Sequence, residues 1–182
     1  MSDNIVIKYC APTLAGLKVG NLFSYKIENI MQFAKSIVSL KKILVLKGLN
    51  IVVLNIKNNV ALIYIYRVKM LKHILSDNNI KEFLTIYGYK SFTIDECIKV
   101  LKVHLKNESF PHEIGVFLGY PLHDIEGFIS NKGKNCECVG CWKAYHKIEE
   151  AKKVFKKYNK CTSIYCNNAK KGFKVVNLTV AS

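Results

Sequence analysis

The sequence Ile51-Val-Val-Leu-Asn-Ile-Lys-Asn-Asn-Val-Ala-Leu-Ile-Tyr-Ile-Tyr66 contains two runs of β-branched, aliphatic and aromatic residues. Such residues pack well on a pleated surface and favour strands. The intervening Lys57-Asn58-Asn59 suits a tight turn, because asparagine tolerates the positive φ that hairpin turns require. We therefore predict a β-hairpin with strands at Ile51–Ile56 and Val60–Tyr66.

One strand and two helices are predicted on the N-terminal side of this hairpin. Ile5-Val6-Ile7 is a short β-rich run and predicts a strand. This strand leads into a helix with Pro12 in its first turn, where the missing N–H of proline costs nothing. Apolar residues recur at helical spacing over residues 29–41 and predict a second helix, with Gly48 as a stop beyond it.

The C-terminal side of the hairpin carries several capping signals. Serine, threonine or aspartate before an apolar periodic segment predicts a helix N-terminus, and glycine predicts a helix end. The elements expected there are a helix capped by Ser76 or Asp77 and ended by Gly88, a helix capped by Thr93 with Glu96, two short helices within residues 112–130, a strand over Trp142–Tyr145, a helix from about Glu149 and a final strand over Val175–Val180.

Together these elements predict an α+β fold. We expect a single compact domain over residues 1–182, in which the β-hairpin belongs to a small mixed or antiparallel sheet packed by several helices. The length suits one domain, and no internal repeat or Pro/Gly-rich linker divides the chain. A cysteine-rich C-terminal part begins at about residue 135.

Neither a secretory signal nor a membrane span is predicted. The opening residues Met1–Ile5 lack a basic region followed by a long apolar one. The most apolar stretch, Ile51–Tyr66, is interrupted by Asn55 and Lys57, whereas a membrane-spanning helix needs about 20 predominantly apolar residues. We therefore expect a cytoplasmic protein with no membrane partner, whose seven cysteines are free thiols or metal ligands rather than disulfides.

The chain is strongly basic, with a formal net charge of +15, and this charge has two interpretations. Arg67 is the only arginine among the 28 basic residues, and such an excess of lysine is typical of AT-rich coding sequences. However, the first 76 residues hold only the acids Asp3 and Glu28, so they can form a positive face for nucleic acid or another acidic partner. The residues assigned to that face are Lys41, Lys42, Arg67, Lys69 and Lys72.

Cysteines are concentrated in Asn135-Cys-Glu-Cys-Val-Gly-Cys-Trp142 and in a later pair. A CxxC turn lets two thiolates converge on a soft metal, and a second pair would complete a tetrahedral site. The predicted ligands of zinc or an iron–sulfur cluster are Cys138, Cys141, Cys161 and Cys166. Thiol–disulfide exchange at the CxxC turn and ordinary structural thiols are the alternatives.

Cys10 is the candidate for a single reactive thiol. It is predicted between a strand and the Pro12-initiated helix, where the helix N-terminus would stabilise a nucleophilic thiolate. The N–H groups of the same turn would bind an anion, with Thr13, Lys18 and Arg67 as further ligands. The alternative is a small buried side chain, which the small neighbouring residues favour.

Pro111-His-Glu-Ile-Gly115 provides a candidate catalytic acid–base pair. His112 and Glu113 transfer protons readily, but adjacent helical residues do not face each other, so each needs a partner elsewhere. The segment also imitates a helix-turn-helix, although Asp124 and Glu126 in its second helix would repel phosphate. A plain helical hairpin is therefore the preferred interpretation. The tyrosines that can line a pocket are Tyr64, Tyr66, Tyr87, Tyr89 and Tyr120.

Four motifs occur in fixed order along the chain: Cys10-Ala-Pro-Thr-Leu-Ala-Gly-Leu-Lys18, Pro111-His-Glu-Ile-Gly115, Leu118-Gly-Tyr-Pro121 and Gly140-Cys-Trp-Lys143. In these motifs the chain resembles the uncharacterised family known as domain of unknown function 3793, found mainly in clostridial-type anaerobic bacteria. The resemblance covers nearly the whole chain and implies no established activity, cofactor or catalytic residue. Tyr9 departs from the histidine that commonly precedes the first motif, so a histidine–cysteine pair with Cys10 is absent here.

Two classes of function follow from these observations. The leading hypothesis is a thiol-centred site, formed either by a cysteine-bound metal or by a reactive cysteine. The alternative is a non-catalytic module that binds nucleic acid or another acidic partner through its lysine-rich face. The sequence leaves open whether the protein is an enzyme.

Overall fold

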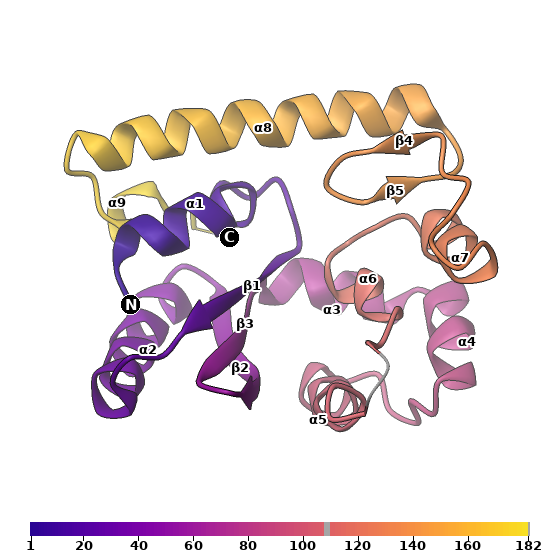
Figure 1. The fold of residues 1–182 in the computed structure, drawn as a ribbon, viewed down its shortest axis with the longest axis horizontal. Coiled ribbons are helices and arrows are strands. Elements are labelled where there is room, and N and C mark those ends of the chain that lie inside the picture. The colour runs from indigo at the N-terminus through magenta and orange to yellow at the C-terminus, as the bar shows by residue number, and fades with distance from the viewer. Residues whose placement is uncertain (108–109, 182) are drawn as a thin grey trace.

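The computed structural model describes residues 1–107 and 110–181, and Figure 1 shows the arrangement of their helices and strands. The helices are α1 (Asp3–Leu14), α2 (Ile30–Val45), α3 (Val68–Ser76), α4 (Asn78–Ile86), α5 (Ile94–His104), α6 (Ile114–Phe117), α7 (Leu122–Ser130), α8 (Ile148–Lys170) and α9 (Val175–Leu178). The strands are β1 (Gly20–Lys26), β2 (Leu49–Lys57), β3 (Val60–Arg67), β4 (Cys138–Val139) and β5 (Lys143–Ala144). The predicted α+β class is confirmed.

The predicted hairpin is also confirmed, and it forms most of a three-stranded antiparallel sheet with the order β1-β3-β2. Lys57 pairs with Val60, so Asn58 and Asn59 alone make the turn, with φ values of 51° and 58°. Positive φ at both central positions is the requirement of a type I′ turn. Local turn chemistry therefore pairs β2 with β3, and the pairing of β1 with the other edge of β3 makes β3 the central strand.

β3 is buried on both faces and contributes to two apolar cores. Ala61, Ile63 and Ile65 belong to one core with α1, α2 and α9. Tyr64 and Tyr66 belong to the other core, with helices α3 to α7. Successive side chains of a strand point to opposite faces, so one strand organises both cores. In Figure 1 the sheet lies between these two groups of helices.

α8 runs across both groups of helices (Figure 1). Its 23 residues extend over roughly 35 Å at the usual helical rise. It packs along α1, and the Tyr158 hydroxyl donates a hydrogen bond to the Leu17 carbonyl at 3.2 Å. α8 is the longest described helix, yet neither it nor any other helix of the described residues combines the length and apolarity that a membrane crossing requires.

Two strand predictions are wrong, because both segments are helical. Ile5–Ile7 belongs to α1, whose buried residues recur at helical spacing and face the sheet. Pro12 therefore lies in the last turn of that helix rather than in the first turn of a later one. Val175–Val180 contains α9, and the Val175 N–H donates to Asp3 Oδ2 at 2.8 Å. Packing between the two ends of the chain has overridden local β preference.

The predicted N-caps at Asp77 and Thr93 are confirmed, whereas the Glu96 carboxylate, which was expected to complete a capping box with Thr93, accepts from Lys99 Nζ at 2.6 Å. The Asp77 carboxylate accepts hydrogen bonds from the N–H groups of Asn79 and Ile80 at the start of α4. The Thr93 hydroxyl accepts one from the Glu96 N–H at 3.4 Å at the start of α5. These contacts satisfy backbone donors that have no partner inside the helix.

Arg67, the last residue of β3, is only 2% exposed. Its guanidinium donates hydrogen bonds to the carbonyls of Thr13 and Leu14 at 2.6 and 2.7 Å, and to that of Val180 at 2.9 Å. The first two carbonyls lie at the C-terminus of α1, where the helix dipole is negative. Burial lowers the pKa of Arg67. No carboxylate forms an ion pair with it among the described residues, so backbone carbonyls stabilise its charge.

We expect Arg67→Met to lower the free energy of unfolding by about 2–4 kcal/mol, because three carbonyls lose their donor in a buried place. Urea denaturation measures this loss. Lys69→Met is the matched control, since Lys69 is exposed on α3 and its loss should cost less than about 0.5 kcal/mol. An Arg67→Met variant as stable as the parent would show that these hydrogen bonds do not hold the fold.

Candidate functional site

Cys10 lies in the second half of α1, with 0% of its surface exposed. Burial raises the pKa of its thiol far above the ordinary range, and the Lys18 ammonium lowers it only in part. The predicted position at a helix N-terminus is therefore wrong, and no helix dipole stabilises a thiolate there. Cys10 instead packs as a small apolar side chain between α1 and the sheet.

The predicted anion site of Thr13, Lys18 and Arg67 also loses its physical basis. No helix begins at Pro12, so the expected N-terminal N–H groups are not available. The Thr13 hydroxyl donates to Asn21 Oδ1 at 2.7 Å, and the Arg67 guanidinium donates to backbone carbonyls. Two of the three side chains thus have structural partners.

The predicted basic face is changed by the burial of Arg67. Lys41 and Lys42 are exposed on α2, and Lys69 and Lys72 are exposed on α3. The face therefore lacks the only arginine of the chain. Arginine is the residue best suited to bidentate phosphate recognition, so what is left is four flexible point charges.

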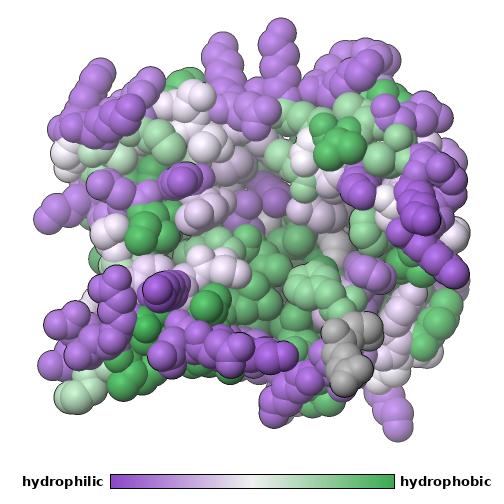
Figure 2. Space-filling view, in the orientation of Figure 1, coloured by the Kyte–Doolittle hydropathy of each residue, from purple (hydrophilic) through white to green (hydrophobic). Residues whose placement is uncertain are grey.

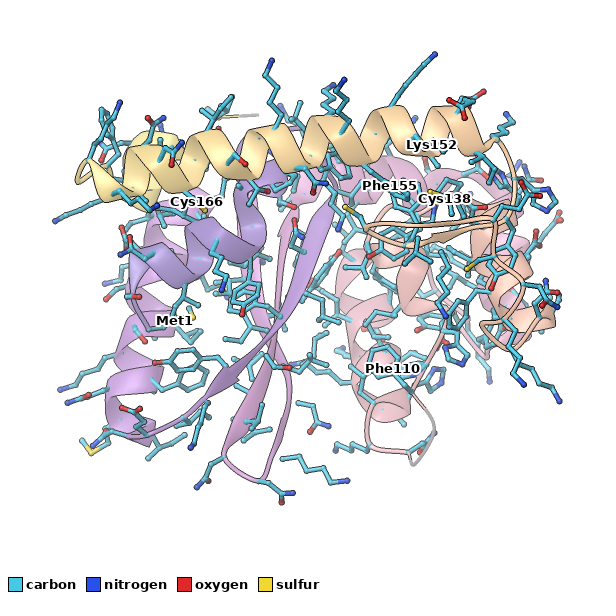
Figure 3. All side chains as sticks on the ribbon, turned by 45° about the horizontal axis from the view of Figure 1, so that its top comes forward. Met1, Phe110, Cys138, Lys152, Phe155 and Cys166 are labelled. Atoms are coloured by element: carbon cyan, nitrogen blue, oxygen red, sulfur yellow. The ribbon has the colours of Figure 1, made fainter. Side chains whose placement is uncertain are left out.

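The four cysteines predicted as metal ligands are not brought together. Cys138 and Cys141 lie on the hairpin β4–β5, whereas Cys161 and Cys166 lie in the second half of α8. Cys138 packs near Phe155, and Cys166 is 11 residues further along the helix, about 16 Å away by the helical rise. Figure 3 shows this separation. Within the described part of the chain, no group of three or more His, Cys, Asp or Glu side chains is placed to hold a metal ion.

Glu113 is buried, but its partner is not His112. His104 lies with Nδ1 2.6 Å from Glu113 Oε1, and the Tyr89 hydroxyl donates to the same oxygen at 3.4 Å. His112 is exposed, and its ring centroid is 5.0 Å from that of Phe128. The acid–base pair expected from the sequence therefore has His104 in place of His112.

A cavity of about 430 Å³, which we call the hairpin cavity, lies between α6, α7 and the hairpin β4–β5. Aromatic and aliphatic side chains form most of its walls. It is lined by Phe110, His112, Ile114, Gly115, Leu118, Tyr120, Asp124, Ile125, Phe128, Val139, Gly140, Trp142 and Lys143. Three of the four sequence motifs contribute to these walls. Figure 2 shows apolar surface in the middle of one face of the molecule, surrounded by hydrophilic side chains.

Asp124 in the first turn of α7 attaches the hairpin to that helix. Its carboxylate accepts hydrogen bonds from Trp142 Nε1 at 2.7 Å and from the N–H groups of Tyr145 and His146 at 2.8 and 3.1 Å. The Trp142 ring also packs edge-on against Phe155 of α8, with centroids 4.5 Å apart. Three donors therefore satisfy this buried carboxylate and fix one wall of the cavity.

Lys18 is a second buried cation, 6% exposed, and it forms no ion pair within the described residues. Its Nζ lies 5.2 Å from the ring centroid of Tyr120, which is itself 5.2 Å from the Trp142 ring centroid. Burial lowers the pKa of Lys18, and the thiols of Cys141 and Cys10 raise it in part. Burial raises the pKa of Cys141, and Lys18 lowers it in part. Lys18 and Cys141 therefore influence each other's pKa.

Sequence reasoning identified some residues of this region and missed others. Tyr120 lines the hairpin cavity and Tyr87 lines a second space, as expected of pocket tyrosines, whereas Tyr64, Tyr66 and Tyr89 are buried in the core. The pair of Asp124 and Trp142 was missed because 18 residues separate its members. The available signal was the only tryptophan of the chain, within the motif Gly140-Cys-Trp-Lys143.

The fold and this site define an α+β protein with a small antiparallel sheet and an apolar cavity between two helices and a hairpin. The chain belongs to the family described as protein of unknown function (DUF3793), whose model matches residues 6–179. The family resemblance noted in the sequence is therefore confirmed. No curated protein and no solved structure matches the chain. Its function has to be inferred from the site itself.

The burial of Cys10 predicts a pH dependence of stability. The folded state raises the pKa of this thiol. The contribution of Cys10 to the free energy of unfolding is therefore complete below the ordinary thiol pKa of about 8.5, and it decreases as the pH rises above that value. Above it, the parent should lose about 1.4 kcal/mol per pH unit more than Cys10→Ala. Urea denaturation between pH 7.5 and 10 measures the difference.

Val6→Ala is the control for this experiment, because it removes buried volume from the same face of α1 without removing a titrating group. Its stability should follow the pH curve of the parent at a constant offset. Parallel curves for the parent and Cys10→Ala would contradict the prediction.

Proposed function

We propose that the protein binds a small, predominantly apolar molecule in the hairpin cavity. The observation that supports this proposal best is the composition of the walls, in which aromatic and aliphatic side chains surround about 430 Å³. Binding sites for small molecules are commonly concave, mostly apolar and roughly 300–1,000 Å³ in volume. The hairpin cavity has these properties.

The polar groups at the cavity also favour an apolar ligand, since most of them already have partners within the protein. Asp124 accepts three hydrogen bonds, from Trp142 in the hairpin and from the two residues that follow β5. Lys143 Nζ donates to the Gly133 carbonyl at 2.7 Å and lies 5.7 Å from the ring centroid of Phe128. A ligand would therefore be held mainly by contact with apolar surface, with the exposed His112 at the edge of the cavity.

Trp142 is the only tryptophan of the chain and lines the cavity, so its fluorescence reports occupancy directly. We expect the neutral apolar probe N-phenyl-1-naphthylamine to gain emission on binding and to quench Trp142 by energy transfer. Phe128→Ala removes an aromatic contact from the wall and should weaken probe binding about tenfold in a fluorescence titration.

Phe173→Ala is the matched control, because Phe173 is 49% exposed and lies outside the cavity. This variant should bind the probe with the affinity of the parent, and far-UV circular dichroism should show that both variants are folded. The proposal fails if Trp142 emission stays constant over the soluble range of the probe, or if Phe128→Ala binds the probe as tightly as the parent.

A second candidate function is thiol chemistry at Cys141, which is half-buried and lies between the cavity residues Gly140 and Trp142. The thiolate is the reactive form of cysteine. Lys18 acts against the effect of burial by lowering the pKa of Cys141. The hypothesis of a thiol-centred site thus moves from the fully buried Cys10 to the half-buried Cys141.

In this second proposal, Lys18→Met should raise the pKa of Cys141 further, because a nearby positive charge is lost. The thiolate fraction at pH 8 would fall, and alkylation of Cys141 by iodoacetamide should slow by about threefold or more. Peptide mass spectrometry at timed intervals measures the rate at this one cysteine. Lys41→Met, which changes an exposed lysine on α2, should leave the rate unaltered. Equal rates in Lys18→Met and the parent would remove the electrostatic basis of the proposal.

A further inference from the structure

A second space of about 410 Å³, which we call the His104 recess, adjoins the hairpin cavity. The two spaces share Phe110 and His112 in their walls. The hairpin cavity presents almost only apolar surface, whereas His104, Tyr87 and Asn107 contribute polar side chains to the recess. A molecule that fills the cavity therefore has a polar compartment beside it, on the other side of His112.

A buried carboxylate holds His104 in the wall of this recess. Glu113 Oε1 lies 2.6 Å from His104 Nδ1, and the two side chains are 2% and 25% exposed, respectively. The Tyr89 ring packs edge-on against the imidazole, with centroids 5.5 Å apart. Both residues line the recess, and the imidazole is the more exposed of the two side chains.

The hydrogen bonds of Glu113 determine which imidazole nitrogen is free. Its Oε1 accepts a hydrogen bond from the Tyr89 hydroxyl, and burial together with the charge of Glu113 raises the pKa of that phenol, so Tyr89 remains a donor. An ionised Glu113 can only accept, and with it the 2.6 Å contact requires a proton on His104 Nδ1. Nε2 of the neutral imidazole then carries a lone pair.

We propose that Nε2 of His104 accepts a hydrogen bond from a hydroxyl or N–H group of the ligand whose apolar part fills the hairpin cavity. The ligand class is therefore an amphiphile with an aromatic or aliphatic body and one hydrogen-bond donor, such as a phenol or an aryl alcohol. Glu113 is a positioning residue that holds the imidazole tautomer. This inference rests on the proposed binding function of the hairpin cavity.

A purely structural role is the alternative for the pair of His104 and Glu113. A hydrogen bond inside a protein contributes only modestly to net stability whether or not it also serves binding, so stability measurements alone do not separate the two roles. Ligand preference does separate them. A purely structural pair would not make the protein bind a ligand with a hydrogen-bond donor more tightly than the same ligand without one.

The test uses 2-naphthol and 2-methoxynaphthalene, which share the same rings but differ in the hydroxyl donor. Each ligand displaces N-phenyl-1-naphthylamine from the protein, and the displacement curve gives its affinity. In the parent we expect 2-naphthol to bind about fivefold or more tighter than its ether. His104→Phe keeps a flat ring but removes Nε2, and it should bind both ligands equally.

His73→Phe is the matched control, since His73 is an exposed histidine on α3 outside the recess. It should retain the preference of the parent for 2-naphthol. His104→Phe leaves a buried carboxylate without its partner, so the double variant His104→Phe/Glu113→Met provides a second test with the carboxylate removed. It should also bind both ligands equally while still binding the probe.

The role of Glu113 has a separate readout in the ¹⁵N chemical shifts of His104 at pH 8. The parent should show the proton on Nδ1, and Glu113→Gln should show a mixture of tautomers. A proton on Nε2 in the parent would overturn the inference. So would equal affinities of the two ligands for a parent protein that still binds the probe, a result that leaves the proposed function standing. Failure of the probe to bind at all would overturn both.

Discussion

The buried charge of Arg67 is the constraint on which the rest of the structure depends. It lies at the end of the central strand β3, and its hydrogen bonds reach the last turn of α1 and the carbonyl of Val180. A guanidinium cannot be buried at low cost unless acceptors surround it, so these three segments have to meet. The loop after α1 leaves from this point and carries Lys18 to the ring of Tyr120, at the back of the hairpin cavity. Two buried cations, Arg67 and Lys18, thus connect the N-terminal core to the candidate site.

The second organising feature is that the sheet and the hairpin β4–β5 have different structural roles. The sheet separates two apolar cores and contributes little to the cavity, whose walls come from α6, α7 and the hairpin. Asp124 joins these elements through three hydrogen bonds, and Trp142 extends the contact to α8. Because those polar groups are satisfied internally, the cavity presents an apolar surface. Polar chemistry is found beside it, at the contact of His104 with Glu113.

Local chemistry explains which elements could be predicted. The turn at Asn58 and Asn59 and the cap at Asp77 act over two to four residues, and both are found as expected. The errors at Ile5–Ile7 and Val175–Val180 have one cause. Both are short apolar runs with β-branched residues, for which strand and helix cannot be distinguished by periodicity. Packing of α1 and α9 into the same apolar core as the sheet stabilises the helical conformation of both segments. The error for Cys10 follows from the wrong strand at Ile5–Ile7. Because that segment is part of α1, Cys10 lies within the helix and not at a helix N-terminus.

The sequence by itself determined the hairpin, the N-caps, the α+β class and the family, and it supplied three motifs that contribute residues to the cavity. Only the tertiary structure decided which side chains meet. It paired Glu113 with His104 rather than with His112, placed Lys18 over the ring of Tyr120, and separated the cysteines of α8 from those of the hairpin. The physical reason is the separation along the sequence over which each kind of interaction acts. Turns, caps and helical periodicity depend on neighbours a few residues away, whereas charges and hydrogen-bond donors find partners by distance in space, wherever the packed cores place them.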